Sequence, residues 1–550
     1  MGANVRKNLI RNSHFCLHTN TSTSVDRDGR TSLRSVIGLV FFIICAMVDS
    51  GSAIAGFVEN HKLMDVGGAS IAMAGNRVVV GSPNGADNKG AVHVYRYDGG
   101  VWVEEQVLTA LEGQDGDGFG FPVALNSTAD RIAVGAPGDG ENGFLAGAVY
   151  VFSLNAGTWV QEQKIIPSDG EATDQFGRAV GISADRVVIG SPFDDDKGSR
   201  SGAVYVYRLN SEMTMWIQEQ KLLAPDGGHE DSLGFAVAID GERIVAGAIQ
   251  TNNCSCLPLT RTGSAYIFGF DNASGSWSFK SKLVPPDGMG GDLFGNSVSL
   301  SENRIVVGTW FGNYAYVYRV DIDTAVPEAE QKLQPSDGAA STNFGFAVAI
   351  GGDRLVVGAP GGNKLYLFEF DGGAGVWVQK QDLITSDAAM SGQFGRSVTI
   401  AGDFAAVGSE GDAYIFRFTP DSDSDGVADN QDQCPNTPSG AIVDTNGCAA
   451  SQLDTDGDGI TDDQDMCTVS DIRPTVIVES CNSGVVNALL TEPIGCTITD
   501  EILSLAETAR SHGQFVSQVD QFLRELQKAD VLEPNEKNAI KDCASQSSLP

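Results

Sequence analysis

The chain has 550 residues, enough for several domains, and 42% of them are hydrophobic. Its 71 acidic residues outnumber 36 basic ones, for a formal net charge of −35 at pH 7. This balance argues against nucleic acid and anionic lipid surfaces as partners and favours divalent cations, high-salt surroundings or basic ligands.

The N-terminal segment has the features of a secretion signal. An apolar run over 36–48 follows several arginines and precedes Ala53-Ile54-Ala55, a small-x-small pattern typical of a cleavage site. The run is shorter than the ~20 residues of a membrane-spanning helix. We expect residues 1–55 to be a signal peptide, with an uncleaved anchor or a start codon assigned too early as alternatives. The mature chain is then secreted or at the cell surface, with no stable membrane insertion.

One phrase, an arginine and β-branched residues ending in Val-Gly-Ala-Pro, repeats along residues 77–409. Its glycines lie 50 to 61 residues apart: Gly81, Gly135, Gly190, Gly247, Gly308, Gly358 and Gly408. Such regular spacing indicates an array of similar structural units.

Each unit contains four stretches with strand character. A Phe-Gly step opens an alternating stretch such as 346–350, and a tight turn leads to the Val-Gly-Ala-Pro strand. A third stretch resembles GAVYVF (147–152), and a fourth resembles WVQEQKI (159–165). Seven units of four strands predict an all-β fold, a seven-bladed β-propeller over residues 56–418.

The two ends of the array complement each other. The last copy has no fourth strand after 412–416, whereas FVENHKL (57–63) precedes the first copy and matches the fourth-strand pattern. The N-terminal strand is therefore predicted to close the ring as the outer strand of blade 7, which would remove two exposed sheet edges.

These repeats resemble the FG-GAP repeats of the integrin α-subunit propeller over roughly 57–418. In that family several blades carry a D-x-D-x-D-G calcium loop between the Phe-Gly strand and the GAP strand. Here that place holds a short turn, for example Ala184-Asp185. The resemblance implies the fold and not the integrin metal sites.

The loops between the second and third strands differ in length between blades. They are long in blades 2 to 4, at 138–146, 193–201 and 249–262, and short in blades 5 to 7. Long loops on adjacent blades predict a patch for a protein or glycan ligand on one face. Its candidate residues are Asp139, Glu141, Asp194, Asp195, Asp196, Lys197, Arg200 and Arg261. Plain solvation of polar loops is the alternative.

Two aspartate-rich loops follow the propeller, at 421–432 and 454–465, in the same register. Carboxylates at positions 1, 3, 5, 9 and 12, with the carbonyl of residue 7, can surround Ca²⁺, which takes 6–8 oxygen ligands. A solvated acidic linker would not explain the shared register. The predicted ligands are Asp421, Asp423, Asp425, Val427, Asp429 and Asp432, and Asp454, Asp456, Asp458, Ile460, Asp462 and Asp465.

With DQCPNTPSGAIVDTNGC (432–448), the first loop resembles the thrombospondin type 3 repeat, which implies calcium-binding repeats over 419–482. The second repeat keeps the loop and the cysteine spacing but has Cys467-Thr468 in place of Cys-Pro.

The cysteines also suggest export. Cys434 and Cys448 are 14 residues apart, as are Cys467 and Cys481. This spacing favours two repeated bridges and a third between Cys496 and Cys543, although spacing alone does not prove connectivity. Cys254 and Cys256 share one loop and are interpreted as a local bridge, with free thiols or metal binding as alternatives.

Residues 483–550 are expected to form a small helical module stapled by a disulfide. Thr499 is a candidate helix cap. Phe515, Val519 and Leu523 recur on one face of a second helix, and a third is expected to start near Pro534.

No catalytic motif occurs: the sequence lacks H-E-x-x-H, G-x-S-x-G and a phosphate-binding loop. No pair of carboxylates stands out as a glycosidase pair. The leading hypothesis is a secreted or cell-surface, calcium-binding, adhesion-like protein that is not an enzyme. An extracellular enzyme acting on polysaccharide and a structural envelope component are the alternatives.

Overall fold

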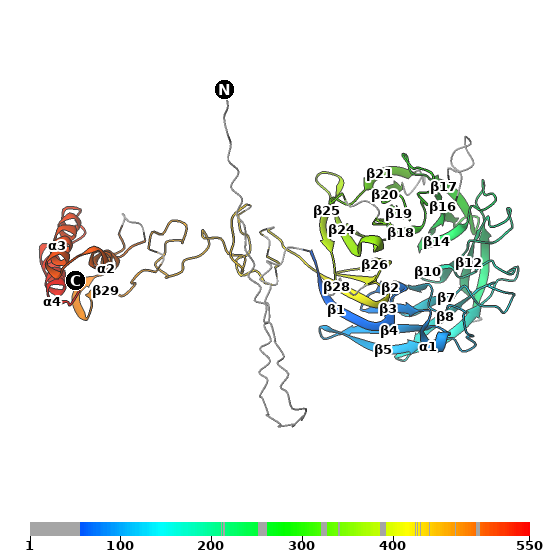
Figure 1. The fold of residues 1–550 in the computed structure, drawn as a ribbon, viewed down its shortest axis with the longest axis horizontal. Helices are drawn as coiled ribbons and strands as arrows, with labels where there is room; N and C mark the ends of the chain where they lie inside the picture. Colours follow the sequence, from blue (N-terminus) through cyan, green and yellow to red (C-terminus); the bar gives the residue numbers. More distant parts are fainter. Residues whose placement is uncertain are drawn as a thin grey trace, which may run out of the picture. The chain divides into compact units, whose positions relative to one another are not determined.

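The computed structural model describes residues 56–550, except 211, 213–214, 251–260, 321–326, 339–341, 386–391, 424, 426, 430, 439, 468, 491–494 and 550. Seven four-stranded antiparallel sheets are arranged as blades around a common centre (Figure 1). The prediction of an all-β, seven-bladed propeller is confirmed. Cys254 and Cys256 lie outside the described residues, as does the predicted signal peptide.

Six blades are built from consecutive strands. Blade 1 contains β2 (Ser70–Ala74), β3 (Arg77–Ser82), β4 (Ala91–Asp98) and β5 (Val101–Leu108). Blade 2 contains β6 (Val123–Leu125), β7 (Arg131–Ala136), β8 (Ala148–Asn155) and β9 (Thr158–Ile165). Blade 3 contains β10 (Ala179–Ser183), β11 (Arg186–Ser191), β12 (Ala203–Asn210) and β13 (Met215–Leu222). Blade 4 contains β14 (Leu233–Asp240), β15 (Arg243–Ala248), β16 (Ser264–Asp271) and β17 (Ser276–Leu283).

Blade 5 contains β18 (Ser297–Ser301), β19 (Arg304–Gly308), β20 (Ala315–Val320) and β21 (Pro327–Leu333). Blade 6 contains β22 (Ala347–Gly351), β23 (Arg354–Ala359), β24 (Lys364–Asp371) and β25 (Val376–Leu383). Blade 7 combines β26 (Ser397–Ala401), β27 (Phe404–Gly408) and β28 (Gly411–Thr419) with the first strand of the described chain, β1 (Gly56–Gly67). Short helical turns occur at α1 (Gly85–Asn88) and η1 (Pro360–Gly362).

The strand β1 occupies the outer position of blade 7. It pairs antiparallel with β28 from Gly56 opposite Thr419 to Gly67 opposite Gly411. Phe57 occupies the place that tryptophan has in β5, β9, β13, β17 and β25. Its backbone N–H donates to Gln381 Oε1 at 2.9 Å and its carbonyl accepts from Gln381 Nε2 at 3.1 Å, as the backbone of Trp377 does with Gln331. The orphan strand of the sequence thus pairs with the far end of the array.

The hydrophobic core of the propeller lies between neighbouring blades. One cluster joins Val79 and Val94 of blade 1 to Ile132 and Tyr150 of blade 2. The phenylalanine of each Phe-Gly step is fully buried, as Phe119 is beside Tyr150 at a ring-centroid distance of 5.4 Å. These repeated phenylalanines are therefore packing residues.

The W-x-Q-E-Q motif of the outer strands joins several of the blades to the next. Gln106 of β5 accepts from the backbone N–H of Trp159 in β9 at 2.8 Å and donates to its carbonyl at 2.9 Å. Glu105 binds Arg77 at 2.8 Å within blade 1 and also accepts from the Trp159 indole at 3.3 Å. The same glutamine clamp recurs from blade 2 to blade 3 and from blade 3 to blade 4.

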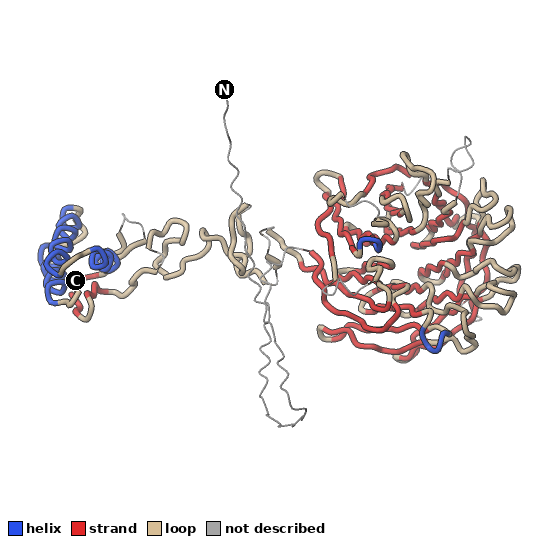
Figure 2. The backbone as a smooth tube through the Cα atoms, viewed as in Figure 1, coloured by secondary structure: helices blue, strands red, loops and turns tan. Residues whose placement is uncertain are grey.

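A two-stranded sheet and three helices form the C-terminal module, in which the longer helices of the described chain are found (Figure 2). The elements are β29 (Thr475–Val478), β30 (Cys481–Val486), α2 (Ile498–Thr508), α3 (His512–Lys528) and α4 (Pro534–Gln546). Val476 and Val478 share one buried core with Phe515, Val519 and Leu523. The hairpin therefore packs with the helices, although the sequence analysis divided the chain at 482. None of the described helices is long and apolar enough to cross a membrane.

The cap of α2 differs from the prediction. Thr497, and not Thr499, is the N-cap, and it forms a reciprocal capping box with Asp500. Thr499 is fully buried, and its hydroxyl bonds Asn487 at 2.9 Å. The acidic residues of the first turn suited either threonine as cap, and the contact with Asn487 selects between them.

Two of the predicted disulfides are wrong. Cys434–Cys448 forms as expected, but Cys467 pairs with Cys496 and Cys481 pairs with Cys543. The reason is an insertion: the segment from 471 to 494, which contains the β29–β30 hairpin, interrupts the second repeat.

The hydrogen bonds show which residues correspond. In the first repeat Thr437 Oγ1 donates to the carbonyls of Cys434 and Gly447. In the second repeat Ser470 Oγ donates to the carbonyls of Cys467 and Gly495. Gly495-Cys496 thus corresponds to Gly447-Cys448. Cys481 lies in the insertion and forms its disulfide with Cys543 of α4.

Candidate functional site

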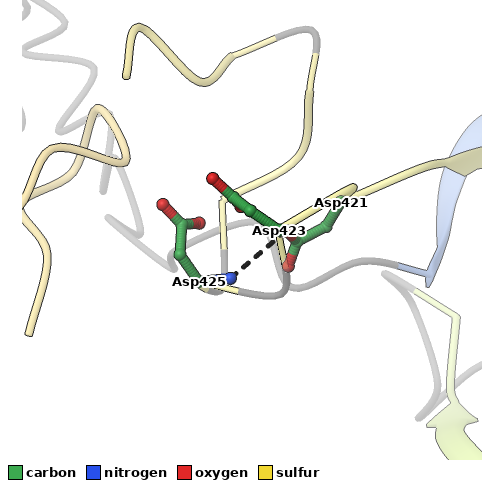
Figure 3. A group of neighbouring side chains, drawn as sticks. All are labelled: Asp421, Asp423 and Asp425. Carbon is green, nitrogen blue, oxygen red and sulfur yellow. Dashed lines mark hydrogen bonds between the residues drawn. The ribbon is translucent and has the colours of Figure 1, made fainter. Parts of the chain in front are cut away.

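The first aspartate loop brings three carboxylates together. Asp421, Asp423 and Asp425 each place one oxygen within 4.8 Å of the others (Figure 3). The backbone holds them there: Asp425 N–H donates to Asp421 Oδ1 at 3.3 Å, and Thr437 N–H donates to Asp423 Oδ2 at 2.6 Å. Asp423 Oδ1 and Asp425 Oδ2 are buried without a hydrogen-bond partner among the described residues. Two oxygens thus have the environment of a cation ligand.

The second loop repeats this arrangement with Asp454, Asp456 and Asp458, whose oxygens also lie within 4.8 Å of one another. Asp458 Oδ2 is buried with no partner in the described part of the chain. Burial raises the pKa of Asp458, and the neighbouring Asp456 and Asp465 raise it further. Such mutual repulsion among carboxylates is what a bound divalent cation relieves.

The other predicted ligands have different environments. Asp429 accepts from the backbone and hydroxyl of Ser422 at 2.6 and 2.7 Å, and Asp462 binds Thr455 in the same way. Asp432 accepts from Cys434 N–H at 2.7 Å, and Asp465 accepts from Cys467 N–H at 2.7 Å. Positions 1, 3 and 5 of each loop therefore converge, while position 9 binds the side chain at position 2.

A glycine brings position 12 beside position 5. A Cβ atom on Gly447, which has φ of +80°, would lie 2.2 Å from Asp432 Oδ1 and 3.1 Å from Asp425 Oδ2. Only glycine leaves room for both carboxylates there. Val427 and Ile460, predicted to ligate through their carbonyls, donate their N–H groups to Asp425 and Asp458 at 2.8 and 2.7 Å. The residues present fit a hard, oxygen-seeking cation.

The predicted ligand patch on blades 2 to 4 contains residues with structural partners. Asp139 is buried, accepts from the Tyr150 hydroxyl at 3.2 Å and binds Lys164 at 2.7 Å. Asp194 is also buried and binds Tyr205 at 2.9 Å and Lys221 at 2.8 Å. These two carboxylates hold their own blades together.

The remaining patch residues lie nearer the solvent. Glu141 binds Lys164 at 2.8 Å, and Asp196 binds Lys221 at 2.6 Å. Asp195 accepts from the backbone of Arg200, whose guanidinium lies 5.4 Å from the Phe193 ring centroid. Lys197 is exposed. Arg261 pairs with Glu230 and Gln250.

Several turns between blades contain a proline shortly before Asp-Gly, and their aspartate contacts the next blade. Asp169 follows blade 2 and accepts from Tyr205 at 3.2 Å and Lys221 at 2.9 Å in blade 3. Asp226 and Asp287 bind the corresponding tyrosine and lysine of the next blade. The aspartate of each turn therefore forms an ion pair with the lysine of the next blade.

A cavity of about 630 Å³ lies where the inner strands meet. It is lined by the first residues of several inner strands and by residues that follow the second strands, including Trp310, Pro360 and Gly361. Arg178 and Arg396 are the charged side chains in its described lining. The cavity therefore combines a wall of apolar, hydroxyl and amide side chains with two cations.

Six segments match the model of the FG-GAP repeat, and together they cover slightly more than half of the chain. They are residues 102–152, 159–207, 216–268, 277–318, 328–372 and 377–426. The chain belongs to the FG-GAP repeat family. Each matched FG-GAP repeat begins at the outer strand of one blade and continues through the third strand of the next, as 102–152 spans β5 to β8.

Two further similarities are short or distant. The chain is 61% identical over 36 residues to the alpha-agarase of Alteromonas agarilytica, a match that covers 6% of this chain and 2% of the agarase. A crystal structure of a protein from Lactobacillus plantarum aligns with a TM-score of 0.40 and 13% identity over 58% of this chain and 84% of that one. Neither similarity identifies a ligand.

The cavity residues are absent from the predicted ligand patch, although the FG-GAP repeats contain a signal for them. The position after the Phe-Gly or Leu-Gly step varies while its neighbours repeat: Phe121, Arg178, Phe235, Asn296, Phe346 and Arg396. All six line the cavity. The blade fold does not require one residue type at this position, so its residues are candidates for contact with a ligand in the cavity.

Proposed function

We propose that this FG-GAP protein is a secreted or cell-surface, adhesion-like protein whose propeller binds a protein or glycan ligand. The observation that carries the proposal is the cavity of about 630 Å³ at the centre of the blades, with Arg178 and Arg396 in its wall. Its volume lies in the range of small-molecule sites, and two cations among apolar residues provide specificity. The exposed residues Glu141, Asp195, Asp196, Lys197 and Arg200 extend the contact surface onto the loops.

An extracellular location is supported by the three disulfides of the described chain, since disulfides persist in oxidising compartments. The predicted signal peptide of residues 1–55 agrees with this proposal.

The two aspartate loops are proposed to bind Ca²⁺ in repeats of the thrombospondin type 3 kind. Three converging carboxylates in each loop, and buried oxygens without partners on Asp423, Asp425 and Asp458, support it. Asp432 lies beside Asp425 across Gly447, and the charge of Asp465 acts on Asp458. Both accept from a backbone N–H, and neither has a protein cation as a partner among the described residues.

A binding array of glycans and extracellular-matrix proteins tests this function, with the full chain applied in calcium and in chelator. We expect saturable binding to one ligand class and no chemical change in that ligand. Absence of binding to every member, in calcium, would contradict the proposal.

A second candidate function is an enzyme acting on polysaccharide, and the short match to an alpha-agarase is the observation that favours it. The match spans 2% of that protein, so its activity does not transfer with the match. Release of reducing ends from agar or another polysaccharide by the purified chain would establish this alternative in place of the first.

A further inference from the structure

The guanidinium of Arg178 is held inside the central cavity by two aromatic rings. Its central carbon lies 4.8 Å from the ring centroid of Phe121 and 4.6 Å from that of Phe235. These residues occupy the same repeat position in blades 2, 3 and 4. Contact with two aromatic rings holds the guanidinium in place, and its N–H groups are the part that can donate to a ligand.

Neither arginine of the cavity has an acidic partner in the described structure. No described residue lining the cavity is Asp or Glu, in a chain with a net charge of −35. No hydrogen bond or ion pair connects the side chain of Arg178 or Arg396 to a described residue. By contrast, Arg77 and Arg186, which lie on second strands, bind Glu105 and Glu219 at 2.8 Å.

This arrangement is electrostatically unfavourable without an anion. Burial and, to a smaller extent, the charge of Arg396 lower the pKa of Arg178 to about 10. Arg178 therefore remains cationic at neutral pH. A buried charge without a counter-charge opposes folding, and two like charges in one cavity repel each other. An oxyanion held between the arginines would relieve both effects.

The rest of the lining indicates what carries the anion. Trp310 packs edge-to-face on Phe346 at 5.4 Å, and Asn343 and Gln393 add amide groups to the wall. Aromatic faces match the C–H faces of a sugar ring, and amides match its hydroxyls, since an amide both donates and accepts. The acidic surface of the chain repels an extended polyanion, which favours a single acidic residue.

We propose that the central cavity binds an acidic sugar, with the carboxylate or sulfate between Arg178 and Arg396 and the ring against Trp310 and Phe346. The proposal rests on the proposed ligand-binding function and names the class of ligand for that site. The arginines donate hydrogen bonds to the oxyanion and determine specificity against neutral sugars.

Calorimetric titration of the full chain tests this assignment. The probes are glucuronic acid, glucose 6-sulfate and glucose, with acetate and inorganic sulfate as bare anions. We expect saturable binding of at least one acidic sugar and none of glucose. Arg396→Gln should weaken the bound acidic sugar about 10- to 100-fold, the loss expected for one charged hydrogen-bonding group. The matched control Arg96→Gln, on the outer part of blade 1, should leave the affinity unchanged.

Comparing the two acidic sugars shows which oxyanion the cavity prefers: tighter binding of glucuronic acid indicates a carboxylate, and tighter binding of glucose 6-sulfate indicates a sulfate. Arg178→Gln removes a stacked side chain, so its fold is checked by circular dichroism, and Arg396→Gln decides the question if Arg178→Gln unfolds. Unchanged affinity in folded Arg396→Gln would overturn the proposal. Bare anions binding as tightly as acidic sugars, or a glutamate peptide binding in their place, would also overturn it. Glycan binding that survives in both variants leaves the proposed function standing and rejects this cavity as its site.

Discussion

At the scale of single residues, a close contact between neighbouring blades explains the two repeated glycines, one in the second strand and one in the Phe-Gly step. A Cβ atom on Gly190, in the second strand of blade 3, would lie 1.9 Å from the carbonyl oxygen of Gly234 in blade 4. Gly234, at the end of the Phe-Gly-type step, has φ of +88°. The same approach joins Gly408 of blade 7 to Gly68 before blade 1. The repeat thus requires glycine where neighbouring blades touch.

Substituting this glycine should therefore destabilise the propeller. Gly190→Ala places a methyl group on backbone that cannot move freely, and we expect a loss of about 1–3 kcal/mol in the free energy of unfolding. Urea unfolding followed by tryptophan fluorescence measures it. Gly372→Ala, where an added Cβ atom meets nothing within 4 Å, is the matched control. Equal unfolding midpoints for the two variants would contradict the role of the contact.

Asp174 should make stability depend on pH. It is buried, and its carboxylate accepts from Glu171 N–H at 2.8 Å. Burial raises its pKa from 3.8 to about 6. The folded state therefore holds a proton that the unfolded state has lost between about pH 4 and pH 6, and the stabilisation present below pH 4 is lost as the pH rises through 6.

The prediction for Asp174→Asn follows from this sign. The variant cannot ionise, so its stability relative to the parent should increase between pH 4 and pH 6 and then stay constant. Urea unfolding of both proteins at several pH values measures the difference. If the free energies of unfolding of the parent and the variant change in parallel across this range, the pKa of Asp174 is the same in the folded and unfolded states and the prediction is wrong.

At the scale of elements, the strand β1 brings the first residues of the propeller to its last blade. Phe57 is buried, packs on Phe418 at 5.7 Å and is clamped by Gln381. Its strand covers β28, which would otherwise be an exposed sheet edge. The blade is thereby built from both ends of the array.

Phe57→Ala should lower the free energy of unfolding by about 3–5 kcal/mol, the range for truncating a buried phenylalanine. Deleting 57–63 should have a larger effect, because the backbone pairs are lost as well. Thermal unfolding followed by circular dichroism measures both. Met64→Ala, on the same strand but 70% exposed, serves as the control and should change little. A deletion variant that melts like the parent would refute the closing role of β1.

The inserted hairpin connects the second aspartate loop to the C-terminal helices. Asp456 Oδ2 accepts from Ser470 N–H just before the insertion, and Asp465 lies beside Gly495 just after it. Asp500 of α2 also accepts from Asp471 N–H at 2.8 Å. A cation bound by this loop would therefore hold together the residues on either side of the insertion, Ser470 and Gly495.

At the scale of the whole molecule, the propeller and the aspartate repeats depend on different sources of stability. The blades bury large apolar clusters, whereas 421–470 is rich in carboxylates and contributes few buried apolar side chains. Segments of this composition cannot offset the entropy of ordering without an ion or a cross-link. Removing calcium should affect the two regions differently.

Chelation is expected to make 421–482 sensitive to protease first, while the propeller remains intact. Asp425→Ala should make only the first repeat sensitive to protease. Asp458→Ala should make the second repeat sensitive, together with the hairpin and helices that follow it. Limited proteolysis with mass spectrometry, with and without chelator, locates the cuts. Cleavage within the blades before the repeats would contradict the placement of calcium.

The sequence by itself determined the seven blades, the four strands of each, the two aspartate loops and the helices α3 and α4. These features depend on local periodicity and on ligands within 12 residues, which the printed order of residues contains. Only the tertiary structure decided the disulfide partners, because the insertion between Cys467 and Cys496 changes which cysteines meet without changing the spacing of the loop. It also decided the cavity: Arg178 and Arg396 come from blades 3 and 7, and they face one space because the inner strands converge on one axis.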